Sequence, residues 1–202
     1  MADAPIASLR TAASRDRVLR ALAVLVAAPF ATTAQRRAAV AAIAALHGSF
    51  GSDAHVCGAA LCAMLHACAG EVAVPLADAL ELARAHLGHV GVVRALLRLL
   101  CLHVASAPFL NGLPRMAHLV ARLIAAHDCE VVAHYGARVL LHVLSLGEGT
   151  LRAAYGASGY EDVRLACVAA AVAARHDGVV VLGGVPWRQH VLDTLAPRLR
   201  AR

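Results

Sequence analysis

Polar side chains recur at every fourth position in the segment that begins at Glu130. Glu130 is followed by His134, Arg138 and His142, and the residues between them are mostly apolar. Residues four apart lie on one face of an α-helix, so these four side chains form a single polar stripe. The stripe predicts a cationic surface for an acidic peptide or a phosphate-bearing ligand. A solvated helix face, which every amphipathic helix has, explains the same spacing.

A second helix repeats this spacing with Arg94 and Arg98. If the two helices stack side by side, their stripes align into one groove. Tyr135 is a candidate anchor in that groove, because Tyr and Arg dominate the energetics of protein interfaces. Tyr155, Tyr160 and Trp187 are further candidates, and core packing explains all of them equally well. The predicted binding residues are Arg94, Arg98, His134, Tyr135, Arg138 and His142.

The segment from Cys57 to Cys68 gathers residue types that bind metals, with Cys62 and His66 on one helical face. The two outer cysteines are about 16 Å apart along a helix, however, at a rise of about 1.5 Å per residue. Four ligands cannot converge on one ion from this helix alone, as tetrahedral zinc requires. We therefore expect no metal site.

Catalytic motifs are missing from the sequence. All 19 basic side chains are arginines, which excludes Schiff-base chemistry and the phosphate-binding lysine of P-loop proteins. Gly156-Ala-Ser-Gly159 does not have the spacing of a nucleophile elbow. Most acidic residues adjoin helix starts, as helix capping predicts. We expect no catalytic residue, no cofactor and no enzyme activity.

The composition favours closely packed helices, since 60% of the residues are hydrophobic but only 3% are aromatic. The net charge of +6 comes mostly from the two ends of the chain. Basic ends make nucleic acid a possible partner, although few aromatic side chains are present to stack on bases. Cysteines within apolar helical segments, without disulfide-type spacing, predict an intracellular protein of the cytoplasm or nucleus. No apolar stretch reaches the 18 to 20 residues, roughly, that a membrane span needs.

An internal repeat with a period of about 39 residues organises the chain. Similar helical segments end at His47, His86 and His127, which lie 39 and 41 residues apart. These histidines are expected to close the ends of their own helices. Val-Pro or Leu-Pro pairs at Pro75, Pro114 and Pro186 place proline in the first turn of a helix. Helices are predicted near 15–28, 35–47, 54–69, 74–87, 91–105, 112–127, 130–146, 149–156, 161–176 and 186–200. The segment 177–184 is expected to be a loop, because an isolated strand there would have no partner.

The segment Gly112-Leu-Pro-Arg-Met-Ala-His118, continued through the helix from Val131 to Leu144, resembles an armadillo repeat. In the armadillo/HEAT family a Gly-x-x-Pro helix is followed by a polar link and a second helix with a Leu-x-x-Leu pattern. The resemblance implies a right-handed α-solenoid of about five repeats, each of two to three helices. It is clearest over residues 35–146, with atypical capping units at 1–34 and 147–202, in one domain over 1–202.

The resemblance implies a concave groove that binds an extended peptide or a protein domain. The chain lacks the recurring Trp-Asn pairs of the nuclear-import members of the family, which argues against recognition of a basic localisation signal. We therefore expect a non-catalytic protein–protein interaction scaffold. Two further possibilities are a basic helical-repeat protein that binds nucleic acid and self-association through an end of the solenoid.

Overall fold

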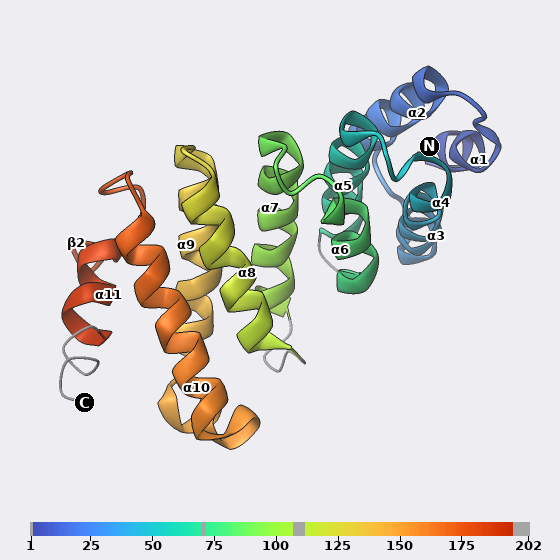
Figure 1. The fold of residues 1–202 in the computed structure, drawn as a ribbon. Coiled ribbons are helices and arrows are strands. Elements are labelled where there is room, and N and C mark those ends of the chain that lie inside the picture. Colours follow the sequence, from blue (N-terminus) through green and yellow to red (C-terminus); the bar gives the residue numbers. More distant parts are fainter. Residues whose placement is uncertain (1, 70–71, 107–111, 196–202) are drawn as a thin grey trace. The chain divides into compact units, whose positions relative to one another are not determined.

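The described part of the chain, residues 2–69, 72–106 and 112–195 of a computed structural model, is predominantly helical (Figure 1). This confirms the predicted all-α class. The helices and strands are, in chain order, α1 (Asp3–Thr11), α2 (Arg15–Ala27), α3 (Thr33–Ala44), α4 (Leu46–Phe50), α5 (Ala54–Cys68), α6 (Leu76–Arg84), α7 (Val90–Ser106), α8 (Leu113–Ala126), α9 (Glu130–Ser145), α10 (Glu148–Ala173), β1 (Val181–Leu182), β2 (Val185–Pro186) and α11 (Trp187–Leu195).

The long predicted helices lie where the apolar periodicity places them. The segments near 15–28, 35–47, 54–69, 74–87, 91–105, 112–127 and 130–146 correspond to α2, α3, α5, α6, α7, α8 and α9, with ends that differ by a few residues. Pro114 lies in the first turn of α8, as predicted. Pro75 and Pro186 instead directly precede α6 and α11.

The two helices predicted near 149–156 and 161–176 form α10, which is interrupted at Gly156. There φ is 74° and ψ is 177°, a backbone conformation that only glycine adopts without strain. The last predicted helix, near 186–200, is observed as α11, and its residues beyond 195 lie outside the described part.

Three elements were not predicted: α1, α4 and a β-hairpin in the segment expected to be a loop. In the hairpin, Val181 pairs with Pro186 and Leu182 with Val185. Gly183 and Gly184 connect the strands with positive φ angles of 56° and 87°, which suit a tight hairpin turn. The expectation of a loop was wrong, since the partner strand begins only three residues after Leu182.

The helices fall into two compact units, unit 1 at 1–106 and unit 2 at 107–202. In unit 1, α5 contacts α2, α3, α6 and α7. Ala60, Ala63 and Ala67 of α5 are fully buried, which allows the helices to approach closely, and Leu61 and Met64 are fully buried beside them. A side chain of that size contributes about 1.5 to 3 kcal/mol when it is fully buried. The centre of unit 1 therefore lies around α5.

In unit 2, α8 contacts α9 and α10, and α11 packs on α10. The two helices α8 and α9 approach tightly at Gly136, where an added Cβ would lie 2.7 Å from Cγ1 of Ile124. Trp187 at the start of α11 is fully buried. The aromatic anchor that the sequence suggested at Trp187 is thus a core side chain.

Several helix carbonyls accept hydrogen bonds from side chains of other elements. Arg36 of α3 donates from Nη1 to the carbonyls of His66, Ala67 and Ala69 at the end of α5, over 2.9 to 3.3 Å. His86 Nε2 lies 2.9 Å from the carbonyl oxygen of Gly51, just after α4. The prediction that His86 closes the end of its own helix was therefore wrong. Its imidazole contacts the backbone just after α4 instead.

Candidate binding surfaces

The exposed face of α7 is cationic along its first half. Arg94 and Arg98 are exposed, whereas Val92, Val93 and the residues on either side of Arg98 are buried. The helix from Val90 to Ser106 contains no acidic residue. The Cα atoms of the two arginines lie about 6 Å apart along the helix axis, at about 1.5 Å per residue. This face is the first candidate surface, and the sequence predicted both of its arginines.

The predicted stripe on α9 is less open. Arg138 is exposed, but His134, Tyr135 and His142 are half-buried. His134 Nδ1 lies 3.1 Å from the carbonyl oxygen of Val179, in the segment before β1. Its ring also meets the Tyr135 ring edge-on, with centroids 5.1 Å apart. His134 and Tyr135 therefore lie together, and His134 already binds this chain's own backbone.

The two predicted stripes belong to different units of the chain. Arg94 and Arg98 lie in unit 1, whereas the α9 residues lie in unit 2. Among the described residues, neither Arg94 nor Arg138 forms an ion pair with a carboxylate. These two guanidinium groups thus keep their full hydrogen-bonding capacity for a ligand.

Other arginines of unit 2 are held by acidic side chains. Arg164 is only 4% exposed and donates from Nη2 to Glu161 at 2.7 Å. Arg152 pairs with Glu148 at 2.8 Å and lies over the ring of Tyr160, 4.7 Å from its centroid. These contacts are internal to unit 2 and leave Tyr160 buried. Tyr160 accordingly has a role in packing.

Three of the cysteines, Cys57, Cys68 and Cys167, are buried thiols. Burial raises the pKa of Cys68 to about 11 and that of Cys167 to about 12. Cys62, by contrast, is exposed. In the described ranges, no three residues with metal-binding side chains lie close enough to share an ion.

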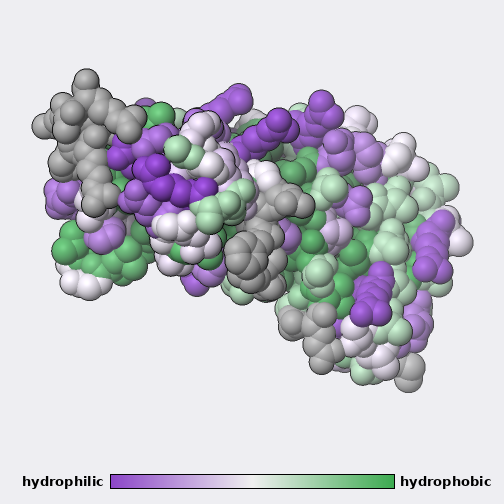
Figure 2. All heavy atoms as spheres, turned by 90° about the horizontal axis from the view of Figure 1, so that it is seen from below, coloured by the Kyte–Doolittle hydropathy of each residue, from purple (hydrophilic) through white to green (hydrophobic). Residues whose placement is uncertain are grey.

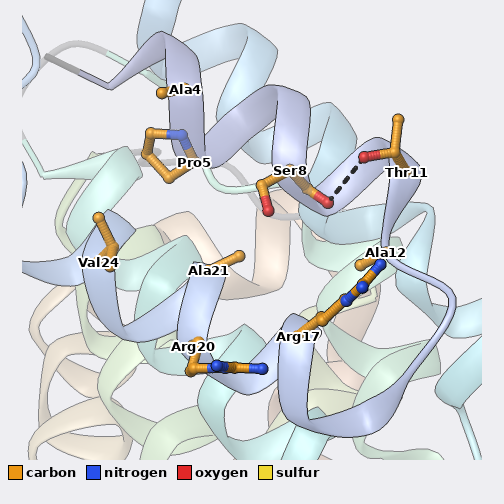
Figure 3. Close-up of a pocket in the computed structure, with 9 residues that line it drawn as sticks. All are labelled: Ala4, Pro5, Ser8, Thr11, Ala12, Arg17, Arg20, Ala21 and Val24. Atoms are coloured by element: carbon orange, nitrogen blue, oxygen red, sulfur yellow. Dashed lines mark hydrogen bonds between the residues drawn. The ribbon is translucent and has the colours of Figure 1, made fainter.

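An open groove of about 540 Å³ lies between α1 and α2 (Figure 3). In Figure 3, Val24 lies opposite Ala4 and Pro5 at one end, and Arg17 lies near Thr11 at the other. The residues that line the groove are Ala4, Pro5, Ser8, Thr11, Ala12, Arg17, Arg20, Ala21 and Val24. Sequence reasoning missed this groove, because it did not predict α1. Pro5, Ile6 and Leu9, which are buried in α1, form the apolar pattern that could have revealed that helix.

Hydrophobic side chains also reach the surface outside this groove. On the face shown in Figure 2 they alternate with hydrophilic ones over much of the molecule. Among the described helices, none combines the length and the hydropathy needed to cross a membrane.

Comparisons with known proteins give no match: no family model, no curated protein and no solved structure is significantly similar to this chain. The candidate surfaces must therefore be interpreted from their own residues.

Proposed function

We propose that this chain is a non-catalytic scaffold, a right-handed α-solenoid of the armadillo/HEAT type, which binds an acidic peptide or protein segment. The observation that carries the proposal is the α7 surface, defined by Arg94 and Arg98. Its arginines are exposed on a helix that has no acidic residue, and their neighbours anchor the helix in the core of unit 1. Rigid placement of the two charges reduces the entropy lost on binding.

The chemistry of this surface favours carboxylate groups. A guanidinium group can donate two parallel hydrogen bonds to one carboxylate, and such charge-assisted bonds are stronger than neutral ones. Two acidic side chains spaced by about 6 Å would match Arg94 and Arg98, a spacing found two residues apart in an extended peptide. An extended segment with alternating Asp or Glu residues is therefore the expected ligand, and Arg138 adds a similar single charge in unit 2.

Binding can be measured by fluorescence anisotropy with a labelled extended peptide of alternating Glu and Ser. Each of the substitutions Arg94→Glu and Arg98→Glu is expected to weaken binding by about tenfold, which corresponds to roughly 1.4 kcal/mol. Arg37→Glu is the matched control, since Arg37 is an exposed arginine of α3 in the same unit. If Arg37→Glu weakens binding as much as Arg94→Glu does, net charge rather than the α7 surface explains the affinity.

The solenoid part of the proposal can be tested by small-angle X-ray scattering. A compact globular chain of 202 residues has a radius of gyration of about 17 Å. A solenoid is more elongated, so a value clearly above this is expected. A radius at the globular value would rule the solenoid out.

Nucleic acid is a second candidate ligand, favoured by the arginines of α1 and α2. Arg10, Arg17 and Arg20 are exposed, and none of them pairs with a carboxylate among the described residues. Binding to phosphates releases counterions, so affinity for a DNA duplex would fall steeply as salt rises. A titration between about 50 and 200 mM salt distinguishes the two candidates, because nucleic-acid binding predicts a loss of about a thousandfold for six phosphate contacts.

A further inference from the structure

We propose that the groove between α1 and α2 is a second docking site, for a short peptide segment that carries an aliphatic residue and, a few positions away, an acidic one. The proposal rests on the scaffold function only in that it requires a protein partner. The groove shares no residue with the α7 surface, so the two sites can be tested separately.

The size of the groove suits a peptide segment. Its volume of about 540 Å³ lies within the range of about 300 to 1,000 Å³ that is typical of ligand sites. Two helices form its walls, α1 on one side and α2 on the other (Figure 3). The groove can therefore enclose a few side chains of a partner and leave the rest of the partner outside.

One end of the groove is cationic, and none of the described residues that line it carries a carboxylate. Arg17 and Arg20 lie three residues apart on the face of α2 that lines the groove. Arg20 Nε donates to the backbone carbonyl of Asp16 at 3.2 Å, and Arg17 has no hydrogen-bond partner within the described residues. Asp16 lies nearby but belongs to the outer surface, with its side chain 80% exposed, and it does not line the groove. An acidic group of the ligand would supply the missing negative charge.

The other end of the groove is apolar. Val24 continues the same face of α2, one helical turn beyond Arg20, and the residue is 54% exposed. Ala4 and Pro5 lie opposite it in Figure 3. An aliphatic side chain placed here would cover the valine and remove apolar surface of both side chains from water, which favours binding. Arg17 and Val24 are seven residues apart on α2, or about 10 Å, which three residues of an extended peptide span.

Polar side chains complete the groove between its two ends. Ser8 is exposed on α1, and the Thr11 hydroxyl donates to the carbonyls of Ala7 and Ser8 over 3.2 and 3.4 Å. The Thr11 hydroxyl oxygen retains lone pairs that can accept a hydrogen bond from an N–H group of a bound peptide. None of the lining residues within the described ranges is aromatic, so stacked bases would find no platform there. A peptide therefore fits these walls better than single-stranded nucleic acid does.

The test uses a labelled decapeptide with one leucine and, three and four residues later, two glutamates. Its affinity for the full chain is measured by fluorescence anisotropy. The double variant Arg17→Gln, Arg20→Gln is expected to weaken binding at least tenfold, and Val24→Ser about threefold. Arg10→Gln is the matched control, because Arg10 is exposed on α1 but does not line the groove. Circular dichroism checks that each variant is as helical as the parent.

The outcomes separate this site from the alternatives. Unchanged affinity in the Arg94→Glu variant, together with the losses above, supports a groove independent of the α7 surface. Three results would overturn the proposal: equal affinity for a peptide with glutamine in place of glutamate, equal weakening by Arg10→Gln, or no binding at about 1 mM peptide. Displacement of the peptide by a DNA oligonucleotide of higher affinity would also overturn it, in favour of a phosphate ligand.

Discussion

The helices α7 and α9 both carry polar side chains four residues apart, but what covers their polar faces differs. On α7, Arg94 and Arg98 are exposed and the helix has no acidic residue. On α9, the half-buried His134 binds the backbone of Val179, which lies 45 residues further along the chain. Spacing therefore identifies which side chains share a face of a helix. It does not identify which part of that face another segment of the chain will use.

The contacts that bury α7 and α9 also differ in how tightly they are packed. The space around one glycine in each contact shows the difference. Gly136 of α9 lies so close to α8 that a Cβ would approach Ile124 to 2.7 Å. A Cβ at Gly58 of α5 would lie 3.7 Å from Val92 Cγ2 on α7, an ordinary contact distance. The contact between α8 and α9 has no free space at this point, and the contact between α5 and α7 has some.

The largest effect is expected for Gly136→Val, which forces two methyl groups into the contact between α8 and α9. Overpacking of this kind costs about 1 to 3 kcal/mol. We expect the free energy of unfolding, from urea titration of the full chain, to fall by about 2 kcal/mol. The control Gly58→Ala should raise it by about 0.5 kcal/mol, because alanine favours the helix. Equal losses from both variants would mean that the two contacts are equally tight.

The next largest effect is expected for His134→Ala, which removes the hydrogen bond to the Val179 carbonyl. A hydrogen bond of this kind contributes about 0.5 to 1.5 kcal/mol. Hydrogen exchange of the hairpin amides between Val179 and Trp187 should become faster, since that segment loses a contact with α9. The control Arg138→Ala changes an exposed residue of the same helix and should leave the exchange unchanged.

A smaller effect concerns the pH dependence of unit 1. Burial lowers the pKa of His103 on α7 below its ordinary value of 6.5. Because the unfolded chain then binds the proton more readily, His103 destabilises the fold as the pH falls below 6.5, and it has no effect above that range. In His103→Gln the free energy of unfolding should fall less between about pH 7 and pH 5 than in the parent. An equal fall in both proteins would show that His103 is solvated.

The smallest effect is expected for Arg94→Ala. Surface substitutions of this kind change stability by no more than about 0.5 kcal/mol. The melting temperature should therefore stay within a few degrees of the parent value, while binding of the acidic peptide weakens, by less than in Arg94→Glu. A drop in stability larger than that from His134→Ala would show that Arg94 supports the fold and that the α7 face is not open.

The positions of the long helices could be predicted because apolar periodicity depends only on nearby residues. The short helix α1 was missed because its nine residues carry only the brief apolar pattern of Pro5, Ile6 and Leu9, which packs against α2 and α3. The hairpin was missed for a different reason. Gly183-Gly184 between two apolar segments is a recognisable signal for a two-residue turn, but the strand before it was treated as isolated.

The candidate sites were only partly predictable. Arg94, Arg98 and Arg138 are exposed polar residues on otherwise apolar helices, so their placement follows from local pattern. The contact between His134 and Val179 joins residues that no local pattern connects. The groove between α1 and α2 likewise depends on how two helices pack, and that cannot be inferred from either helix alone.

The carbonyl contacts of Arg36 have a consequence for truncation of the chain. One nitrogen atom on α3 donates to three carbonyls at the end of α5, and His66 Nε2 of α5 lies 3.2 Å from the carbonyl of Ala28, just after α2. If the first helices were deleted, α5 would lose the Arg36 donor and the Ala28 acceptor as well as its apolar neighbours. Unit 1 is therefore expected to unfold as one cooperative block. Shortened versions of this protein should keep α2, α3 and α5 together or omit all three.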